Sequence, residues 1–234
     1  MCNPCPLGMS SAVGSANCTF DTCPKGYYQE SQRGVPCQGC PAGKFGNGTG
    51  YTSVQQCKNC PTNTYSSAAG LDSPSKCNVC PAGRASTTQG ITSVDECLPC
   101  QRGYFGDANG VARVCPAGQY QDEEGQTQCK LCPAGKFGDG TGYTSAQQCQ
   151  NCSTNTYSSA SGLDASNKCN VCPAGRSSTS TGLTAATQCT PCAKGRFTNA
   201  NTGSTTLCPQ GQYQDEEGQT QCKLCPAGRY GERT

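Results

Sequence analysis

The sequence contains no histidine and is poor in the apolar residues that fill protein cores. Leu, Ile, Val and Phe together number 22 of 234 residues, about 9%. A composition below roughly 20% rarely buries enough apolar surface to fold. No run approaches the roughly 18 apolar residues of a transmembrane helix. These absences exclude a globular domain built around one hydrophobic core, so something else must order the chain.

The lack of histidine also removes the usual general base of hydrolytic enzymes. The acidic runs 122–124 and 215–217 each fall in a segment with the composition of a turn, where we expect them to be solvated, with a weak calcium contact as the alternative. The net charge is only +2, without a cluster of Lys or Arg that would bind nucleic acid or an anionic membrane. We therefore expect no enzymatic activity, no cofactor and no nucleic-acid partner.

Cysteine is abundant instead, with 24 residues, about 10% of the chain. That level is typical of a disulfide scaffold, and each closed loop of about 15 residues removes about 3 kcal/mol of unfolded-state entropy. Because cytosolic thiols are kept reduced, this content predicts an extracellular or cell-surface location. Met1 is followed at once by Cys2, which is not a signal peptide. We therefore expect an internal piece of a longer precursor, attached to a membrane only through an anchor outside this chain.

Two periods are nested in the sequence. The shorter, about 20 residues, separates successive CxxC pairs, and the longer is 92 to 93 residues, so that segment 118–135 returns unchanged at 211–228. A fixed period identifies a repeat architecture. The predicted divisions are a partial N-terminal repeat (1–36), two long repeats (37–128 and 129–221) and the start of a third (222–234).

Most CxxC pairs are followed by Pro, a small residue, Gly and a polar residue, as in CPAGKFG. Pro fixes φ and Gly accepts positive φ, so the pattern predicts a turn that starts a short extended segment. These segments are led by Phe45, Phe105, Phe137 and Tyr230. With helical periodicity absent, the predicted fold is small and disulfide-rich: an elongated tandem-repeat rod of short β-hairpins and loops, with negligible helix and no single hydrophobic core.

Spacing alone does not fix disulfide connectivity, but pairing across each intervening segment is the economical hypothesis. A crossed pattern is the alternative. The neighbour pairing gives Cys5–Cys18, Cys23–Cys37, Cys40–Cys57, Cys60–Cys77, Cys80–Cys97, Cys115–Cys129, Cys132–Cys149, Cys152–Cys169, Cys172–Cys189 and Cys208–Cys222.

Each long repeat holds nine cysteines, so one stays unpaired: Cys100 in the first and Cys192 in the second. Cys18 lies five residues before Cys23, and Gly110 and Gly203 take the equivalent places before the next lone cysteines, so the expected partner is missing. A leftover cysteine predicts an intermolecular bond or a free thiol. A crossed pattern that absorbs it is the alternative.

The CxxC-x16-CxxC spacing also fits four-cysteine zinc sites. A thioredoxin-like redox site is a further alternative, but it requires a CxxC pair at a helix N-terminus, and no such helix is predicted. Ten CxxC pairs at near-uniform spacing favour structural staples over either alternative.

Three Asn-x-Ser/Thr sequons predict glycosylation at Asn17, Asn47 and Asn151. Asn47 lies in a Gly-rich turn and is the best candidate, while its copy in the next long repeat is Asp139. Asn17 and Asn151 each precede a cysteine, which restricts access.

The recurring CPAGKFGNGTG, CPAGRYG and CxxC blocks resemble the cysteine-rich surface immobilization antigens of ciliates, and more broadly the ephrin-receptor-like and tumour-necrosis-factor-receptor-like modules. The resemblance implies a secreted, disulfide-bonded, lipid-anchored coat glycoprotein without catalytic residues. We expect a structural coat or filament protein that associates with itself or with other extracellular proteins. A receptor ectodomain that binds a protein ligand is the alternative, although no repeat carries a distinct aromatic or charged patch.

Overall fold

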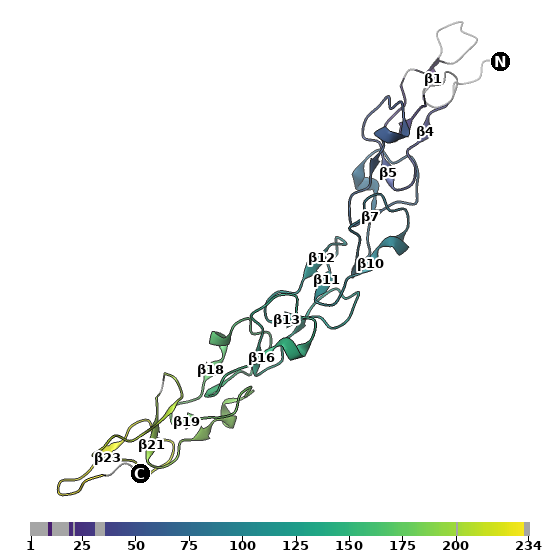
Figure 1. The fold of residues 1–234 in the computed structure, drawn as a ribbon. Coiled ribbons are helices and arrows are strands. Elements are labelled where there is room, and N and C mark those ends of the chain that lie inside the picture. The colour runs from purple at the N-terminus through teal and green to yellow at the C-terminus, as the bar shows by residue number, and fades with distance from the viewer. Residues whose placement is uncertain (1–8, 11–18, 21, 31–35, 200, 232–234) are drawn as a thin grey trace. The chain divides into compact units, whose positions relative to one another are not determined.

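The computed structural model describes residues 9–10, 19–20, 22–30, 36–199 and 201–231. The regular structure of these residues consists of two-stranded antiparallel hairpins and short 3₁₀ helices, without an α-helix or a closed sheet (Figure 1). The predicted small disulfide-rich hairpin fold is confirmed, and the 3₁₀ helices are an addition to it. The helices are η1 (Val54–Gln56), η2 (Pro74–Lys76), η3 (Val94–Glu96), η4 (Ala146–Gln148), η5 (Ser166–Lys168) and η6 (Ala186–Gln188).

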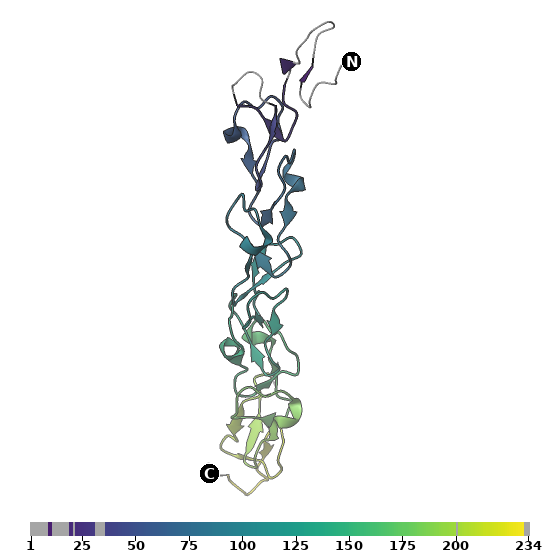
Figure 2. The ribbon, with the colours of Figure 1, turned by 90° about the vertical axis from the view of Figure 1, so that its right-hand side faces the viewer.

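Two compact units make up the chain. Unit 1 covers the described residues of Met1–Gln101, Phe105–Arg113 and Glu124–Thr127, and unit 2 covers those of Arg102–Tyr104, Val114–Glu123 and Gln128–Thr234. Within each unit, hairpins follow one another in chain order, as both views show (Figures 1 and 2). The four-part division by long repeats rests on the sequence and stays a prediction.

The hairpins of unit 1 pair strands that are mostly two residues long. They are β1 (Met9–Ser10) with β2 (Thr19–Phe20), β3 (Tyr27–Tyr28) with β4 (Gln38–Gly39), β5 (Lys44–Phe45) with β6 (Lys58–Asn59), β7 (Thr64–Tyr65) with β8 (Asn78–Val79), and β9 (Arg84–Ala85) with β10 (Leu98–Pro99). A hairpin of three-residue strands, β11 (Tyr104–Gly106) with β12 (Ala112–Val114), follows them in the chain.

Unit 2 repeats the pattern. Its hairpins are β13 (Gln119–Tyr120) with β14 (Lys130–Leu131), β15 (Lys136–Phe137) with β16 (Gln150–Asn151), β17 (Thr156–Tyr157) with β18 (Asn170–Val171), β19 (Arg176–Ser177) with β20 (Thr190–Pro191), β21 (Arg196–Thr198) with β22 (Thr205–Leu207), and β23 (Gln212–Tyr213) with β24 (Lys223–Leu224).

The predicted turn starts the hairpins from β3 onward. In CPAGKF the amide of Lys44 donates to the carbonyl of Pro41 at 3.0 Å, and Gly43 between them has a φ of 75°. This positive φ is what the third position of a type II turn requires. The prediction was wrong at one place: Tyr230 lies in no strand and is 84% exposed.

Two hairpins replace the turn glycine by asparagine. Asn63 and Asn155 have φ values of 61° and 60° and are the non-glycine residues with positive φ in the described chain. The Oδ1 atom of Asn63 accepts a hydrogen bond from the amide of Ser86 at 3.1 Å, and Asn155 does the same for Ser178 at 3.0 Å. Asparagine tolerates this conformation better than most residues, and here it also satisfies an amide of the next hairpin.

Within the units, main-chain hydrogen bonds join neighbouring hairpins. The amides of Gly43 and Gly46 donate to the carbonyls of Ser66 and Leu71, and the amide of Gly70 donates back to Cys40, all at 2.8 Å. An isolated parallel bridge between Phe45 and Leu71 lies in the same place. These hairpins are therefore ordered by backbone groups of their neighbours, as in other repeat proteins.

The same bonds recur in unit 2. Gly135 and Gly138 donate to Ser158 and Leu163, and Gly162 donates to Cys132, again at 2.8 Å. Because these contacts use only backbone atoms and glycine, the side chains between them are free to vary.

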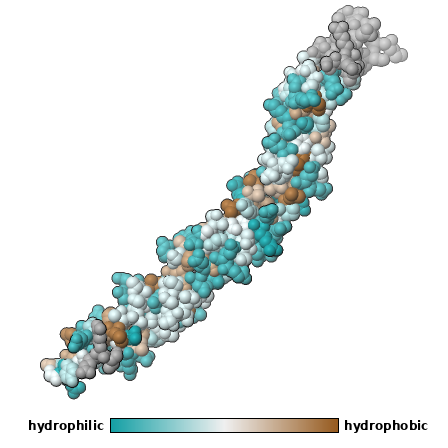
Figure 3. Space-filling view, viewed as in Figure 1, coloured by the Kyte–Doolittle hydropathy of each residue, from teal (hydrophilic) through white to brown (hydrophobic). Residues whose placement is uncertain are grey.

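Small separate clusters take the place of a single core. Phe45 packs with Cys60, Cys77 and Leu71 in unit 1, and the equivalent cluster of unit 2 is centred on Phe137. The face drawn in Figure 3 carries its apolar residues in small groups within a hydrophilic surface. Disulfide sulfur thus supplies much of the buried volume that aliphatic side chains supply elsewhere.

In four of the six described 3₁₀ helices, a Gln or Glu side chain at the third position accepts hydrogen bonds from the backbone that precedes the helix. In η3 the Oε1 atom of Glu96 accepts hydrogen bonds from the amides of Thr92 at 2.9 Å and Ser93 at 3.0 Å. Gln56 takes the same role in η1. These helices were not predicted, although the repeated Thr-Ser-x-x-Gln/Glu pattern has the signature of a capping box.

Candidate functional site

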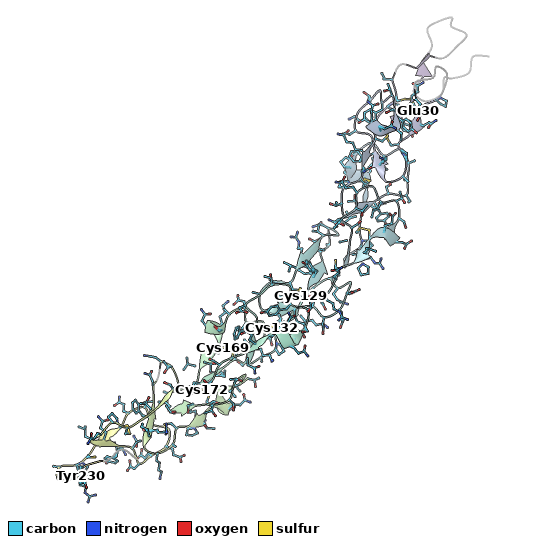
Figure 4. The ribbon with its side chains drawn as sticks, in the orientation of Figure 1. Glu30, Cys129, Cys132, Cys169, Cys172 and Tyr230 are labelled. Atoms are coloured by element: carbon cyan, nitrogen blue, oxygen red, sulfur yellow. A yellow bond between two sulfur atoms is a disulfide. The ribbon has the colours of Figure 1, made fainter. Side chains whose placement is uncertain are left out.

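The candidate site is the ladder of disulfides that runs through both units. Each bond closes one hairpin over 14 or 17 residues, with Cα atoms 5.8 to 6.0 Å apart. Figure 4 labels four of the cysteines in unit 2. The bonds are Cys23–Cys37, Cys40–Cys57, Cys60–Cys77, Cys80–Cys97, Cys115–Cys129, Cys132–Cys149, Cys152–Cys169, Cys172–Cys189 and Cys208–Cys222.

This connectivity is the pairing across each intervening segment, and the described cysteines form no crossed pair. The proposed Cys5–Cys18 bond lies outside the described residues. Since disulfide sulfur offers no thiolate, these cysteines cannot be zinc ligands. The described residues also contain no group of three or more His, Cys, Asp or Glu side chains able to hold a metal ion.

Cys100, Cys192 and Cys225 are free in the described chain. Cys100 is 3% exposed and Cys192 is 2% exposed. The thiol of Cys192 lies 3.3 Å from the carbonyl oxygen of Gln219, a hydrogen-bonding distance for sulfur. Burial, with a smaller effect of the Asp107 carboxylate, raises the pKa of the Cys100 thiol above its ordinary value. Thiols buried in this way cannot reach another chain without local opening.

The hairpin register shows where the missing partner belongs. In β15–β16, Phe137 pairs with Gln150. The next position of the second strand toward the turn is Cys149, which lies three residues before Cys152. In β21–β22 the step after Phe197↔Thr206 is Thr198↔Thr205, three residues before Cys208. Thr205 therefore occupies the position of the lost cysteine.

The assignment of that position to Gly110 and Gly203 was wrong. Both glycines have positive φ, 67° and 63°, and a Cβ on Gly110 would lie 2.8 Å from the carbonyl oxygen of Cys80. Cysteine would be strained at either place. Counting back from the lone cysteine failed because the count used the five-residue spacing of Cys18 and Cys23, whereas the register follows the three-residue spacing of the CxxC pairs.

The acidic runs form ion pairs within their own hairpins. Lys130 lies 2.7 Å from both Asp122 and Glu123, and Lys223 lies 2.7 Å from Asp215. The hydrogen bond from Lys130 lowers the pKa of the Asp122 carboxyl, and the two acids raise the pKa of Lys130. All of these groups are exposed, so the pairs add little to stability.

The structure separates the predicted sequons. Asn47 lies in the turn after β5, whereas Asn151 belongs to β16 and precedes the buried, disulfide-bonded Cys152; both asparagines are exposed. Asn17 lies outside the described residues. A search of the described residues for helices long and apolar enough to span a membrane gave none.

A comparison with protein families identifies the repeats. The family model described as tyrosine-protein kinase ephrin type A/B receptor-like matches residues 8–57, 104–149 and 195–234, more than half of the chain. The chain belongs to the ephrin receptor-like family. No curated protein matches it.

The ephrin receptor-like matches agree with the hairpin pattern. The matches at 104–149 and 195–234 begin at β11 and β21, the two hairpins that follow the free Cys100 and Cys192. The disulfides and the family together indicate an extracellular location.

Proposed function

We propose that this ephrin receptor-like chain is a structural element of an extracellular or cell-surface coat, of the kind the resemblance to ciliate surface antigens implies. It has no enzymatic activity and requires no cofactor. Its partners are copies of itself or other extracellular proteins.

The observation that carries this proposal is the repeated set of backbone hydrogen bonds between neighbouring hairpins. The bonds of Gly43, Gly46 and Gly70 in unit 1 recur at Gly135, Gly138 and Gly162 in unit 2 with the same lengths. A contact made by backbone and glycine preserves the spacing of the hairpins and sets no requirement on the exposed side chains. Such an arrangement suits a spacer better than a specific pocket.

Two further features support a structural role. The segment 118–135 returns unchanged at 211–228, which is expected where period matters more than one special face. The burial of Cys100 and Cys192 does not favour covalent cross-linking through them, so we propose that association is non-covalent.

Sedimentation velocity over a concentration series, on chain with its accessible thiols alkylated, tests the proposal. We expect reversible oligomers that run as monomer on a non-reducing gel. In native buffer Cys100 and Cys192 should resist alkylation, and in denaturant without reductant both should react.

A receptor ectodomain is the second candidate, and membership of the ephrin receptor-like family favours it. A chain that stays monomeric at every concentration and binds one surface protein saturably would support the receptor and count against the coat.

A further inference from the structure

We propose that the fold selects among the sequons, so that Asn47 carries an N-linked glycan and Asn151 does not. The inference is independent of whether the protein is a coat element or a receptor, because it requires only passage through a secretory pathway.

The turn after β5 presents Asn47 for modification. Asn47 and Thr49 are both exposed, and Gly48 lies between them. The Oδ1 atom of Asn47 accepts a hydrogen bond from the Tyr51 hydroxyl at 3.1 Å, and the same hydroxyl accepts one from the amide of Gly48 at 3.1 Å. The Nδ2 atom of Asn47 has no hydrogen-bond partner among the described residues. The turn thus holds the Asn47 side-chain oxygen in place and leaves its amide nitrogen, the atom that receives the glycan, free to react.

Asn151 is exposed as well, but its amide nitrogen has a hydrogen-bond partner. Its Nδ2 atom donates to the Thr181 hydroxyl at 3.3 Å. Its side chain packs so closely on Gly182 that a Cβ there would lie 3.0 Å from the Asn151 Cγ atom. The middle residue of the sequon, Cys152, is fixed by its bond to Cys169. A glycan on Asn151 would have to displace the loop of the β19–β20 hairpin, which holds Thr181 and Gly182.

The second long repeat supplies a natural comparison. Asp139 takes the place of Asn47, and its Oδ1 atom accepts from the Tyr143 hydroxyl at 3.0 Å, as Asn47 accepts from Tyr51. The turn geometry is therefore kept in both repeats, and only the first has an amide nitrogen. Asp139→Asn recreates the sequon in a turn that already has the right shape.

The modification is a balanced transfer from a lipid-pyrophosphate-linked oligosaccharide. The Asn47 Nδ2 atom forms a bond to C1 of the first sugar, the bond from C1 to the pyrophosphate oxygen breaks, and the lipid pyrophosphate leaves while the amide loses one proton. The sequon hydroxyl of Thr49 is the recognition element. The product is a bulky, solvating group on the surface.

The test is expression of the full chain, behind a secretion leader, in a eukaryotic cell. An Asn17→Gln background confines the readout to the two described sequons. Enzymatic deglycosylation in heavy-oxygen water converts each modified asparagine into labelled aspartate, which peptide mass spectrometry locates. We expect the label at Asn47 and not at Asn151, loss of one glycan in Thr49→Ala, and gain of one glycan in Asp139→Asn.

The matched variants decide the result. Unlabelled Asn47 in secreted, disulfide-bonded protein overturns the proposal, as does label at Asn151 at the level found at Asn47. As a check on the role of the fold, Cys172→Ser with Cys189→Ser keeps the sequon at Asn151 and opens the β19–β20 hairpin, which holds Thr181 and Gly182. Label at Asn151 in this variant alone supports selection by the fold, and a still unlabelled Asn151 shows that the folded hairpin is not what protects it.

Discussion

Gly118 and Gly211 are the same residue in two different surroundings. They lie in the identical segments 118–135 and 211–228, and both have a φ of 81°. A Cβ on Gly118 would overlap the carbonyl oxygen of Gly162, whereas a Cβ on Gly211 would meet nothing within 4 Å. Alanine substitutions at Gly118 and Gly211 therefore separate the free-energy cost of a side chain at positive φ from the cost of close packing.

We expect Gly118→Ala to destabilise its hairpin by about 1–3 kcal/mol more than Gly211→Ala, the usual range for overpacking. Both variants share the cost of alanine at positive φ. The measurement is the rate at which dithiothreitol reduces the local disulfides, Cys115–Cys129 and Cys208–Cys222, mapped by differential alkylation. Equal acceleration at the two disulfides would show that the Gly162 carbonyl moves aside at little cost.

The cap of η3 predicts a local response to acid. Hydrogen bonds from the backbone of Thr92 and then Ser93 lower the pKa of Glu96 below its ordinary value. A lowered carboxyl pKa stabilises the fold above the ordinary value of about 4.3, and this contribution is lost as pH falls through the lower folded value. In an NMR titration the Thr92 and Ser93 amide shifts should therefore move below about pH 4.3.

Gln56 provides the internal control, because it makes the same bonds to Thr52 and Ser53 without a titrating group. The Thr52 and Ser53 shifts should stay constant over that range, and Glu96→Gln should remove the response at Thr92. A response that persists in Glu96→Gln would assign the titration to another acid.

At the scale of the hairpin, β21–β22 keeps its shape without a staple. Its register places Thr205 where other hairpins have the cysteine that pairs with the equivalent of Cys192. We expect Thr205→Cys to form a bond with Cys192 and to stabilise the hairpin by about 3 kcal/mol, the value for a loop of about 15 residues. Peptide mapping without reduction identifies the bond, and thermal unfolding measures the gain.

Gly203→Cys is the matched control. Its positive φ and the Asn155 carbonyl oxygen, 3.0 Å from a Cβ placed there, disfavour the bond. This variant should keep Cys192 free and should lose stability. A bond from Cys192 to position 203 in preference to 205 would contradict the register argument.

The same hairpins show how far sequence reasoning reaches. The disulfide pairing across each segment could be predicted from cysteine spacing, because a short loop places few other cysteines within reach. The CPAG turn could be predicted from its Pro and Gly residues. The true place of the missing partner did not follow, because the five-residue spacing of Cys18 and Cys23 was used in place of the three-residue spacing of the CxxC pairs. The bridge between Phe45 and Leu71 also escaped, because stacking depends on backbone groups that sequence does not distinguish.

At the scale of the whole molecule, stability should spread only between neighbours. Opening one hairpin of unit 2 with Cys152→Ser and Cys169→Ser removes the cluster around Phe137. We expect the adjacent bonds, Cys132–Cys149 and Cys172–Cys189, to be reduced faster, and Cys208–Cys222 to be unaffected. Differential alkylation over time measures all of the rates together, and uniform acceleration would indicate a single cooperative unit.

The hairpins β11–β12 and β21–β22 also determine how the protein yields when it is pulled. Under tension a disulfide-closed hairpin cannot release its loop, because the load passes through the sulfur–sulfur bond. The stretches from Cys100 to Cys115 and from Cys192 to Cys208 have no such bypass in the described chain. Under force, these two stretches would therefore lengthen first. Each long repeat would then contain one extensible segment between segments of nearly fixed length.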